Sequence, residues 1–190
     1  MTHLPFLYPS RLLIPEFDSI FVEIGFGGGD FILEQALANP KALWVGFEIK
    51  NRRYDNLVRR VQKQKIENIQ LVQAPAESAF STLLSEASVE AIFILFPDPW
   101  PKRKHAENRI WNREFLSTCW NTLKVGGVLH LATDDTPYLQ QGLQVIESIG
   151  GFATAEPKII TTHYARKWKQ AARPLHRYSF RKESRHQSVP

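Results

Sequence analysis

Short apolar runs alternate along this chain with longer segments of helical periodicity, and this alternation constrains the fold more than any other feature. The predicted strands cover residues 19–24, 42–49, 69–72, 91–95 and 128–132. The predicted helices cover residues 30–38, 51–65, 79–86, 111–123 and 137–149. Strands that alternate with helices in this way predict an α/β fold, in which a doubly wound parallel sheet carries helices on both faces.

A single domain is expected to span all 190 residues, because a chain of this length can bury one sizeable core and no low-complexity linker interrupts it. Residues 1–17 show no clear period and are interpreted as an N-terminal arm, which is a poor match to a signal peptide. Residues 161–190 are interpreted as a basic C-terminal segment, with a final edge strand at residues 176–181. No apolar run approaches the roughly 20 residues that span a bilayer.

Cys119 is the single cysteine, so an internal disulfide is excluded and a reducing, cytoplasmic location is favoured. Its place in a helix-like segment indicates a packing role rather than a nucleophile. The formal net charge is +5, and residues 166–185 contain eight Lys or Arg residues against one acid, Glu183. This excess favours a polyanionic partner, nucleic acid first, although solubility alone would also account for it.

The first predicted strand ends in a glycine-rich turn that includes Gly25, Gly27 and Gly29. Glycines let a backbone approach a ligand closely, but the run G-F-G-G-G does not match the dinucleotide pattern G-x-G-x-x-G. Glu23 and Asp30 flank the turn with negative charge, which disfavours a pyrophosphate. A ligand with cationic groups and no phosphate suits the turn better, so S-adenosylmethionine is favoured over a nicotinamide dinucleotide.

Two further strand ends suggest contacts to an adenosine. Glu48 ends the second predicted strand and is expected to accept hydrogen bonds from both ribose hydroxyls. No aspartate follows the third strand, so the backbone at Ala76, or the side chain of Gln73 or Glu77, is expected to meet the adenine.

The sequence T-D-D-T-P at residues 133–137 supports two interpretations, which can both hold. Asp134 can face the site, while Asp135 or Thr136 caps the following helix. Because ligands of doubly wound sheets bind outside the carboxyl ends of the strands, Asp134 is expected to share one site with the other motifs. His163 is interpreted as a solvated side chain, and a role as general base is the less favoured alternative.

The loop after the fourth predicted strand has the sequence FPDPWPKRK, at residues 96–104. Its three alternating prolines exclude a helix and predict a stiff, extended backbone. The loop carries Asp98 and Trp100, and Lys102, Arg103 and Lys104 follow at once. A carboxylate, an aromatic plane and three cations suit a planar, partly cationic group on a polyanion, and the alternative is a solvated run of charge.

The segments EIGFGGG, GFEI, FPDPWPKRKH and ATDDTPY together resemble the bacterial tRNA (guanine-N7-)-methyltransferase family of the TrmB type, over about residues 21–182. The resemblance implies a Rossmann-like class I methyltransferase fold, with S-adenosyl-L-methionine as cofactor and tRNA as partner. It implies transfer of the methyl group to N7 of guanosine 46 in the tRNA variable loop. A monomer and a homodimer both remain open.

By position, Glu23 and Glu48 match the family's cofactor-binding acids, Asp98 matches the acid of the proline loop, and Lys102 and Asp134 match substrate-contacting positions. Taken with the patterns above, the predicted cofactor site comprises Glu23, Gly25, Gly27, Gly29, Glu48, Ala76 and Asp98. The predicted substrate site comprises Trp100, Lys102, Arg103, Asp134, Thr162 and Tyr164. Catalysis is assigned to Asp98, and no metal site is predicted.

The sequence departs from the family pattern at two positions. The family motif T-x-[FY]-E appears here as residues 162–165, with Ala165 in place of the glutamate, and the aspartate usual after the third strand falls on Pro75. The first departure affects guanine recognition, and the second affects the adenine contact. The alternative is therefore a non-catalytic or differently specific protein of the same fold that binds S-adenosylmethionine and RNA.

Overall fold

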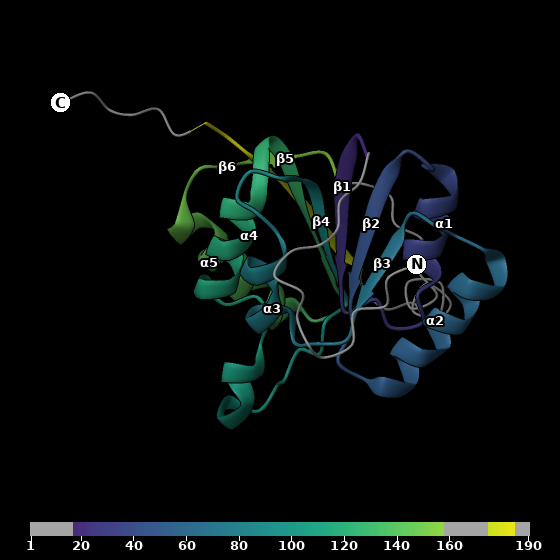
Figure 1. Ribbon diagram of the computed structural model, residues 1–190. Coiled ribbons are helices and arrows are strands. Elements are labelled where there is room, and N and C mark those ends of the chain that lie inside the picture. Colours follow the sequence, from purple (N-terminus) through teal and green to yellow (C-terminus); the bar gives the residue numbers. More distant parts are fainter. Residues whose placement is uncertain (1–16, 158–174, 185–190) are drawn as a thin grey trace.

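The computed structural model describes residues 17–157 and 175–184, and these residues form a seven-stranded sheet flanked by helices (Figure 1). The strands are β1 (Ser19–Ile24), β2 (Ala42–Phe47), β3 (Ile69–Val72), β4 (Val89–Leu95), β5 (Leu123–Thr133), β6 (Phe152–Ala155) and β7 (His176–Lys182). Their order is β3-β2-β1-β4-β5-β7-β6. The pairs among β1 to β5 are parallel, whereas β7 runs antiparallel to β5 and β6.

Helices cover both faces of the sheet. The helices α1 (Asp30–Ala38) and α2 (Asn51–Gln64) lie on one side, and α3 (Ala76–Leu83), α4 (Arg113–Thr122) and α5 (Thr136–Ile149) lie on the other (Figure 1). A short 3-10 helix, η1 (Arg103–Asn108), follows the proline loop. The arrangement confirms the predicted doubly wound α/β sheet. Among the described residues, no helix is long and apolar enough to cross a membrane.

Two element boundaries differ from the prediction for local reasons. The α3 helix begins at Ala76, three residues earlier than predicted, with Pro75 at its N-cap. Proline suits a helix start because its fixed φ and missing N–H cost nothing there. The β5 strand begins at Leu123, five residues before the predicted start at residue 128, and runs through Gly126 and Gly127. A register shift lies opposite them in β4, so the glycines mark a strand irregularity.

The predicted edge strand exists, but the prediction that it lies at the edge is wrong. The β7 strand pairs with β5 on one side and with β6 on the other, so β6 forms the edge. The β6 strand was not predicted, because its sequence FATA is short and half-buried and shows no clear alternation. Its pairing with β7, from Phe152 opposite Lys182 to Ala155 opposite Ser179, defines it.

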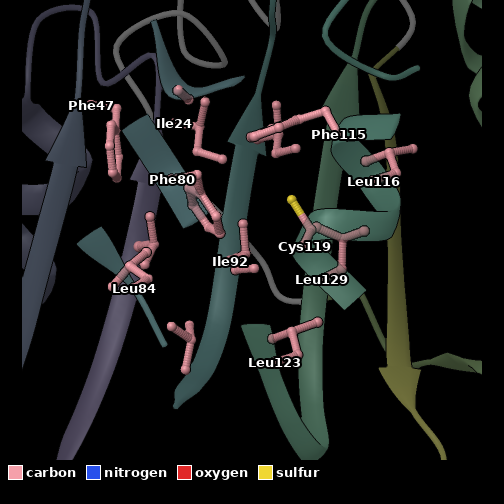
Figure 2. Packing of buried hydrophobic residues seen from close by; sticks show 14 of the residues in the cluster. Ile24, Phe47, Phe80, Leu84, Ile92, Phe115, Leu116, Cys119, Leu123 and Leu129 are labelled. Atoms are coloured by element: carbon pink, nitrogen blue, oxygen red, sulfur yellow. The ribbon is translucent and has the colours of Figure 1, made fainter. Parts of the chain in front are cut away.

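The core consists of two apolar clusters, one on each face of the sheet. Figure 2 shows the first, where Phe80, Phe115 and Cys119 from the helices pack against Ile92 and Leu129 of the strands. Cys119 is fully buried, and burial raises the pKa of its thiol, which agrees with the predicted packing role. The central parallel strands are buried on both faces, which explains why their sequences are continuously apolar.

Candidate active site

A glycine turn joins β1 to α1, and its shape depends on glycine. Gly25, Gly27 and Gly29 have φ angles of 70°, 56° and 76°, in the left-handed region that favours glycine. A Cβ atom on Gly29 would lie 2.5 Å from Cδ1 of Leu57. Only glycine at this position lets α2 pack directly against the turn, so the backbone here is open to a ligand on one side and tightly supported on the other.

Arg60 of α2 supports the turn from outside, and no sequence motif pointed to this residue. Its guanidinium donates to the Gly28 carbonyl at 2.5 Å and to the Asp30 carboxylate at 2.7 Å. The charge of Asp30, which was expected to favour a cationic ligand, is therefore partly neutralised within the protein. Of the two acids that flank the turn, Glu23 is the one whose carboxyl group is left to face a ligand.

Glu23 lies at the end of β1, with only 3% of its surface exposed. Its Oε2 atom has no hydrogen-bond partner among the described residues. Burial raises the pKa of this carboxyl well above the usual 4.5; the Ile32 backbone amide opposes the shift, and the Asp30 and Glu48 carboxylates add to it. A buried acid with an unsatisfied oxygen can accept a hydrogen bond from an ammonium group.

Glu48 is buried and fully engaged with the backbone. Its Oε2 accepts from the Gly27 N–H at 3.0 Å, and its Oε1 accepts from the N–H groups of Ile49 and Lys50 at 2.9 and 3.0 Å. Arg53 Nη1 lies 3.7 Å from Oε2. These bonds explain why β2 ends at Phe47, two residues before the predicted end. Through these bonds, Glu48 links the end of β2 to the glycine turn.

A cavity of about 470 Å³ lies between the glycine turn, α2 and the proline loop. Its lining includes Glu23, residues 25–29, Arg53 and Arg60 of α2, and residues 95–99 with Asp98. The structure therefore brings Glu23, the glycines and Asp98 together, as predicted. Glu48 bonds to Gly27 of the lining without being part of it, and Ala76 is buried and is not part of the lining either. A second hollow of about 350 Å³, near Leu37 and Ile66, carries none of the motif residues.

The proline loop is not uniformly extended, so that part of the prediction is wrong. Phe96 and Trp100 have φ angles of 52° and 43°, although each precedes a proline. Tertiary hydrogen bonds override the local preference: the Phe96 N–H donates to the Ala132 carbonyl at 2.8 Å, and Arg109 donates to the Trp100 carbonyl at 3.0 Å. The loop turns twice and presents Asp98, whose side chain is 69% exposed, with Lys50 Nζ 3.8 Å from its carboxylate.

The remaining predicted residues fall into three groups. Asp135 caps α5 by accepting from the Tyr138 N–H at 2.7 Å, which confirms one of the two interpretations of the T-D-D-T-P segment. Asp134 is half-buried at the end of β5 but does not line the cavity, and Trp100 and Lys102 are exposed beyond it. Residues 162–165, which include Thr162 and Tyr164, lie outside the described residues, and the side chain of Arg103 is not described either.

Neither Arg60 nor Arg109 was found from the sequence, because both hold backbone carbonyls rather than partners in a recognisable motif. The prolines gave an indirect signal for Arg109, since a loop in which every second residue lacks an N–H has few donors of its own for its carbonyls. In residues 17–157 and 175–184, no three His, Cys, Asp or Glu side chains lie close enough to hold a metal ion.

Comparison with known proteins adds the family context. Residues 18–178 match a family described as "Putative methyltransferase". The chain is 34% identical over 155 residues to a tRNA (guanine-N(7)-)-methyltransferase of Thermotoga maritima, covering 79% of this chain but 50% of that protein. It is 34% identical over 152 residues to the enzyme of the same name from Chlorobium phaeobacteroides, covering 79% of this chain and 74% of that protein. The chain thus spans about half the length of the Thermotoga relative.

Among solved structures, the fold is similar to that of a 16S rRNA (adenine(1408)-N(1))-methyltransferase W203A mutant with cosubstrate SAM, from Catenulisporales acidiphilia. The TM-score is 0.67 at 18% sequence identity, and the similarity covers 92% of this chain and 90% of that one. At this identity the similarity establishes a methyltransferase-type fold and nothing more specific.

Proposed function

This chain belongs to the tRNA (guanine-N7-)-methyltransferase family, and we propose that it transfers a methyl group from S-adenosylmethionine to N7 of guanosine 46 in the tRNA variable loop. One observation carries the proposal: a single cavity is lined by the glycine turn and Glu23 on one side and by Asp98 on the other. The relatives' names supply the substrate class, and the cavity supplies a place where a methyl donor and a guanine can meet.

The residues present fit S-adenosylmethionine. The unsatisfied Oε2 of Glu23 suits the ammonium group of the donor, and the left-handed glycines leave the backbone open to close approach. Glu48 holds the turn in place by accepting a hydrogen bond from the Gly27 N–H. Ala76 is the first residue of α3, so its backbone N–H has no partner within the helix. When bound, the donor supplies an electrophilic methyl group on a sulfonium.

The chain's own contribution to the reaction is mainly positioning. Guanine N7 carries an in-plane lone pair at neutral pH, so it can attack the methyl group in line without first losing a proton. Correct alignment of such reactants can supply a large part of a rate enhancement. Asp98 is exposed and lines the cavity, where it would accept from guanine N–H groups and offset the positive charge developing on the purine.

The residues beyond the cavity are proposed to bind the rest of the tRNA. Trp100, 38% exposed, would stack on a base, and such stacking contributes about 1–3 kcal/mol. Lys102 and Arg103 would contact phosphates, while Asp134, with Thr162 and Tyr164, would meet the guanine. Acting as a monomer or a homodimer, the protein would work in the cytoplasm, as the proposed tRNA substrate requires.

A second candidate is a non-catalytic protein that binds S-adenosylmethionine and RNA. It is favoured by the two departures from the family pattern, at Pro75 and Ala165. Pro75 occupies the N-cap of α3 and offers no side-chain acceptor to an adenine amino group.

The test is methyl transfer from radiolabelled S-adenosylmethionine to unmodified tRNA, with G46 and A46 transcripts compared. We expect labelling of the G46 transcript alone. Equal labelling of both transcripts would leave a methyltransferase with a different target position. No labelling of either, with binding of both S-adenosylmethionine and tRNA retained, would support the second candidate.

A further inference from the structure

The proline loop cannot hold itself in place through its own backbone. Pro97, Pro99 and Pro101 have no N–H group, so every second residue of this part of the loop lacks a backbone donor. Its start is fixed by the bond from the Phe96 N–H to the Ala132 carbonyl of β5. Beyond that point the carbonyls depend on donors from other parts of the chain.

Arg109 supplies two of those donors. Its Nε donates to the Pro99 carbonyl at 2.9 Å, and its Nη2 donates to the Trp100 carbonyl at 3.0 Å. Its Nη1 donates to the side chain of Gln141 on α5. The rigid, planar guanidinium thus spans two successive carbonyls of the loop, which a lysine ammonium cannot do with the same geometry.

Arg109 is itself held by a rigid support. Its guanidinium carbon lies 5.8 Å from the ring centroid of Tyr138, whose hydroxyl accepts from the Trp111 N–H at 3.0 Å. The Tyr138 and Trp111 rings are buried and stacked, with centroids 4.6 Å apart. A Cβ on Gly142 of α5 would lie 2.6 Å from the Trp111 ring, so glycine permits this close packing. The loop is therefore tied to the α5 side of the fold.

Asp98 lies between the two fixed points, Phe96 and Pro99. Its ion pair with Lys50 is long at 3.8 Å and joins two exposed side chains, so it constrains the carboxylate weakly. The backbone on either side must therefore set the direction of Asp98. Trp100, with a φ of 43°, needs the same support to keep a conformation that its own preferences disfavour.

We propose that Arg109 is a positioning residue for the proline loop: by holding the carbonyls of Pro99 and Trp100 it orients Asp98 and Trp100 toward the guanine. This role rests on the proposed function. Arg109 touches neither substrate nor cofactor in this role, and it acts only through the loop.

The test compares Arg109→Ala and Arg109→Lys with a matched control, Arg113→Ala. Arg113 also reaches α5, where it donates to the Ser148 carbonyl and hydroxyl at 2.9 and 2.6 Å, but it does not contact the loop. We expect Arg109→Ala to lower kcat by roughly 10- to 100-fold, with KM for S-adenosylmethionine within about twofold of wild type. Arg109→Lys should recover little of this loss, and added methylguanidinium should partly restore Arg109→Ala.

Trypsin cleavage after Lys102, Arg103 and Lys104 gives a second measurement that needs no methyl transfer. Release of the loop should raise the cleavage rate in Arg109→Ala and leave it at the wild-type level in Arg113→Ala. Wild-type protein that fails to methylate G46 tRNA would refute the proposed function. The cleavage rates would still test whether Arg109 holds the proline loop in place. Unchanged cleavage in Arg109→Ala, or equal losses of kcat and of melting temperature in both alanine variants, would overturn the positioning role.

Discussion

The buried surroundings of Glu23 oppose the ionisation of its carboxyl group. The ionisation of this one residue therefore affects how stability depends on pH and how a cationic ligand binds. Burial raises its pKa well above 4.5, so between 4.5 and the raised value the folded protein holds a proton that the unfolded chain has released. The folded state therefore loses stability as pH rises through this window. Above the raised pKa, the cost of the buried charge is present in full until a cation compensates it.

The Glu23→Gln variant should remove this cost. We expect its melting temperature without ligand to exceed that of wild type at pH 8, and the difference to shrink as pH falls toward 4.5. The same variant should bind S-adenosylhomocysteine, which keeps the ammonium group, roughly 10-fold or more weakly, because a charge-assisted hydrogen bond is lost. Thermal unfolding across this pH range and calorimetric titration would measure the two effects.

Glu34→Gln is the matched control, since Glu34 lies on the exposed face of α1. It should leave both the pH profile and the ligand affinity unchanged. If Glu23→Gln kept the wild-type pH dependence, another group would be responsible for it, and unchanged ligand affinity would remove Glu23 from the cofactor site.

At the scale of elements, the turn between β5 and α5 contains two adjacent aspartates with different expected roles: Asp135 is structural, and Asp134 is proposed to bind substrate. Asp135→Ala removes the N-cap of α5 and should lower the free energy of unfolding by about 1 kcal/mol, with tRNA affinity unchanged. Asp134→Ala should instead weaken tRNA binding, which Asp135→Ala leaves unchanged. Urea denaturation and filter binding would measure the two quantities. A loss of stability in Asp134→Ala equal to that in Asp135→Ala would show that both residues are structural.

The same elements show which parts of the fold a sequence can predict. The β1 strand and α1 helix were predicted with the bounds that the structure gives, because β1 is a short, mostly apolar run and a glycine turn separates it from α1. The β6 strand was missed because its identity depends on pairing with β7, about 30 residues further along the chain. Pairing partners so far apart leave no local pattern.

In the candidate site, too, some residues could be predicted from the sequence and others could not. Glu23, the glycines and Asp98 were predicted to meet because the carboxyl ends of parallel strands lie at one edge, and they line one cavity. Arg60 and Arg109 were not predicted, because a long side chain that holds a distant carbonyl has no fixed spacing from it. The two turns of the proline loop were missed for the same reason, since tertiary hydrogen bonds fix them.

At the scale of the whole molecule, the basic residues proposed to bind tRNA phosphates are separate from the cavity proposed to carry the chemistry. The net charge is +5, and Lys102 and Lys104, which follow the proline loop, lie outside the cavity lining that includes Asp98. Phosphate contacts supply affinity without fixing which base is presented, whereas the cavity acts on the base alone. Binding and turnover should therefore respond to different substitutions and to different conditions.

The double variant Lys102→Ala, Arg103→Ala and the single variant Asp98→Ala test this separation. The double variant should weaken tRNA binding and reduce the slope of log Kd against log salt concentration by about 1–2, since each lost phosphate contact removes roughly 0.7–0.9. Asp98→Ala should keep the wild-type slope and lower kcat by roughly 100-fold or more. Binding titrations between 50 and 200 mM salt, a range in which such slopes are well measured, and single-turnover methylation would check both. Equal losses of turnover in the two variants, with tRNA affinity intact, would show that the loop works as one catalytic unit and that the affinity resides elsewhere in the chain.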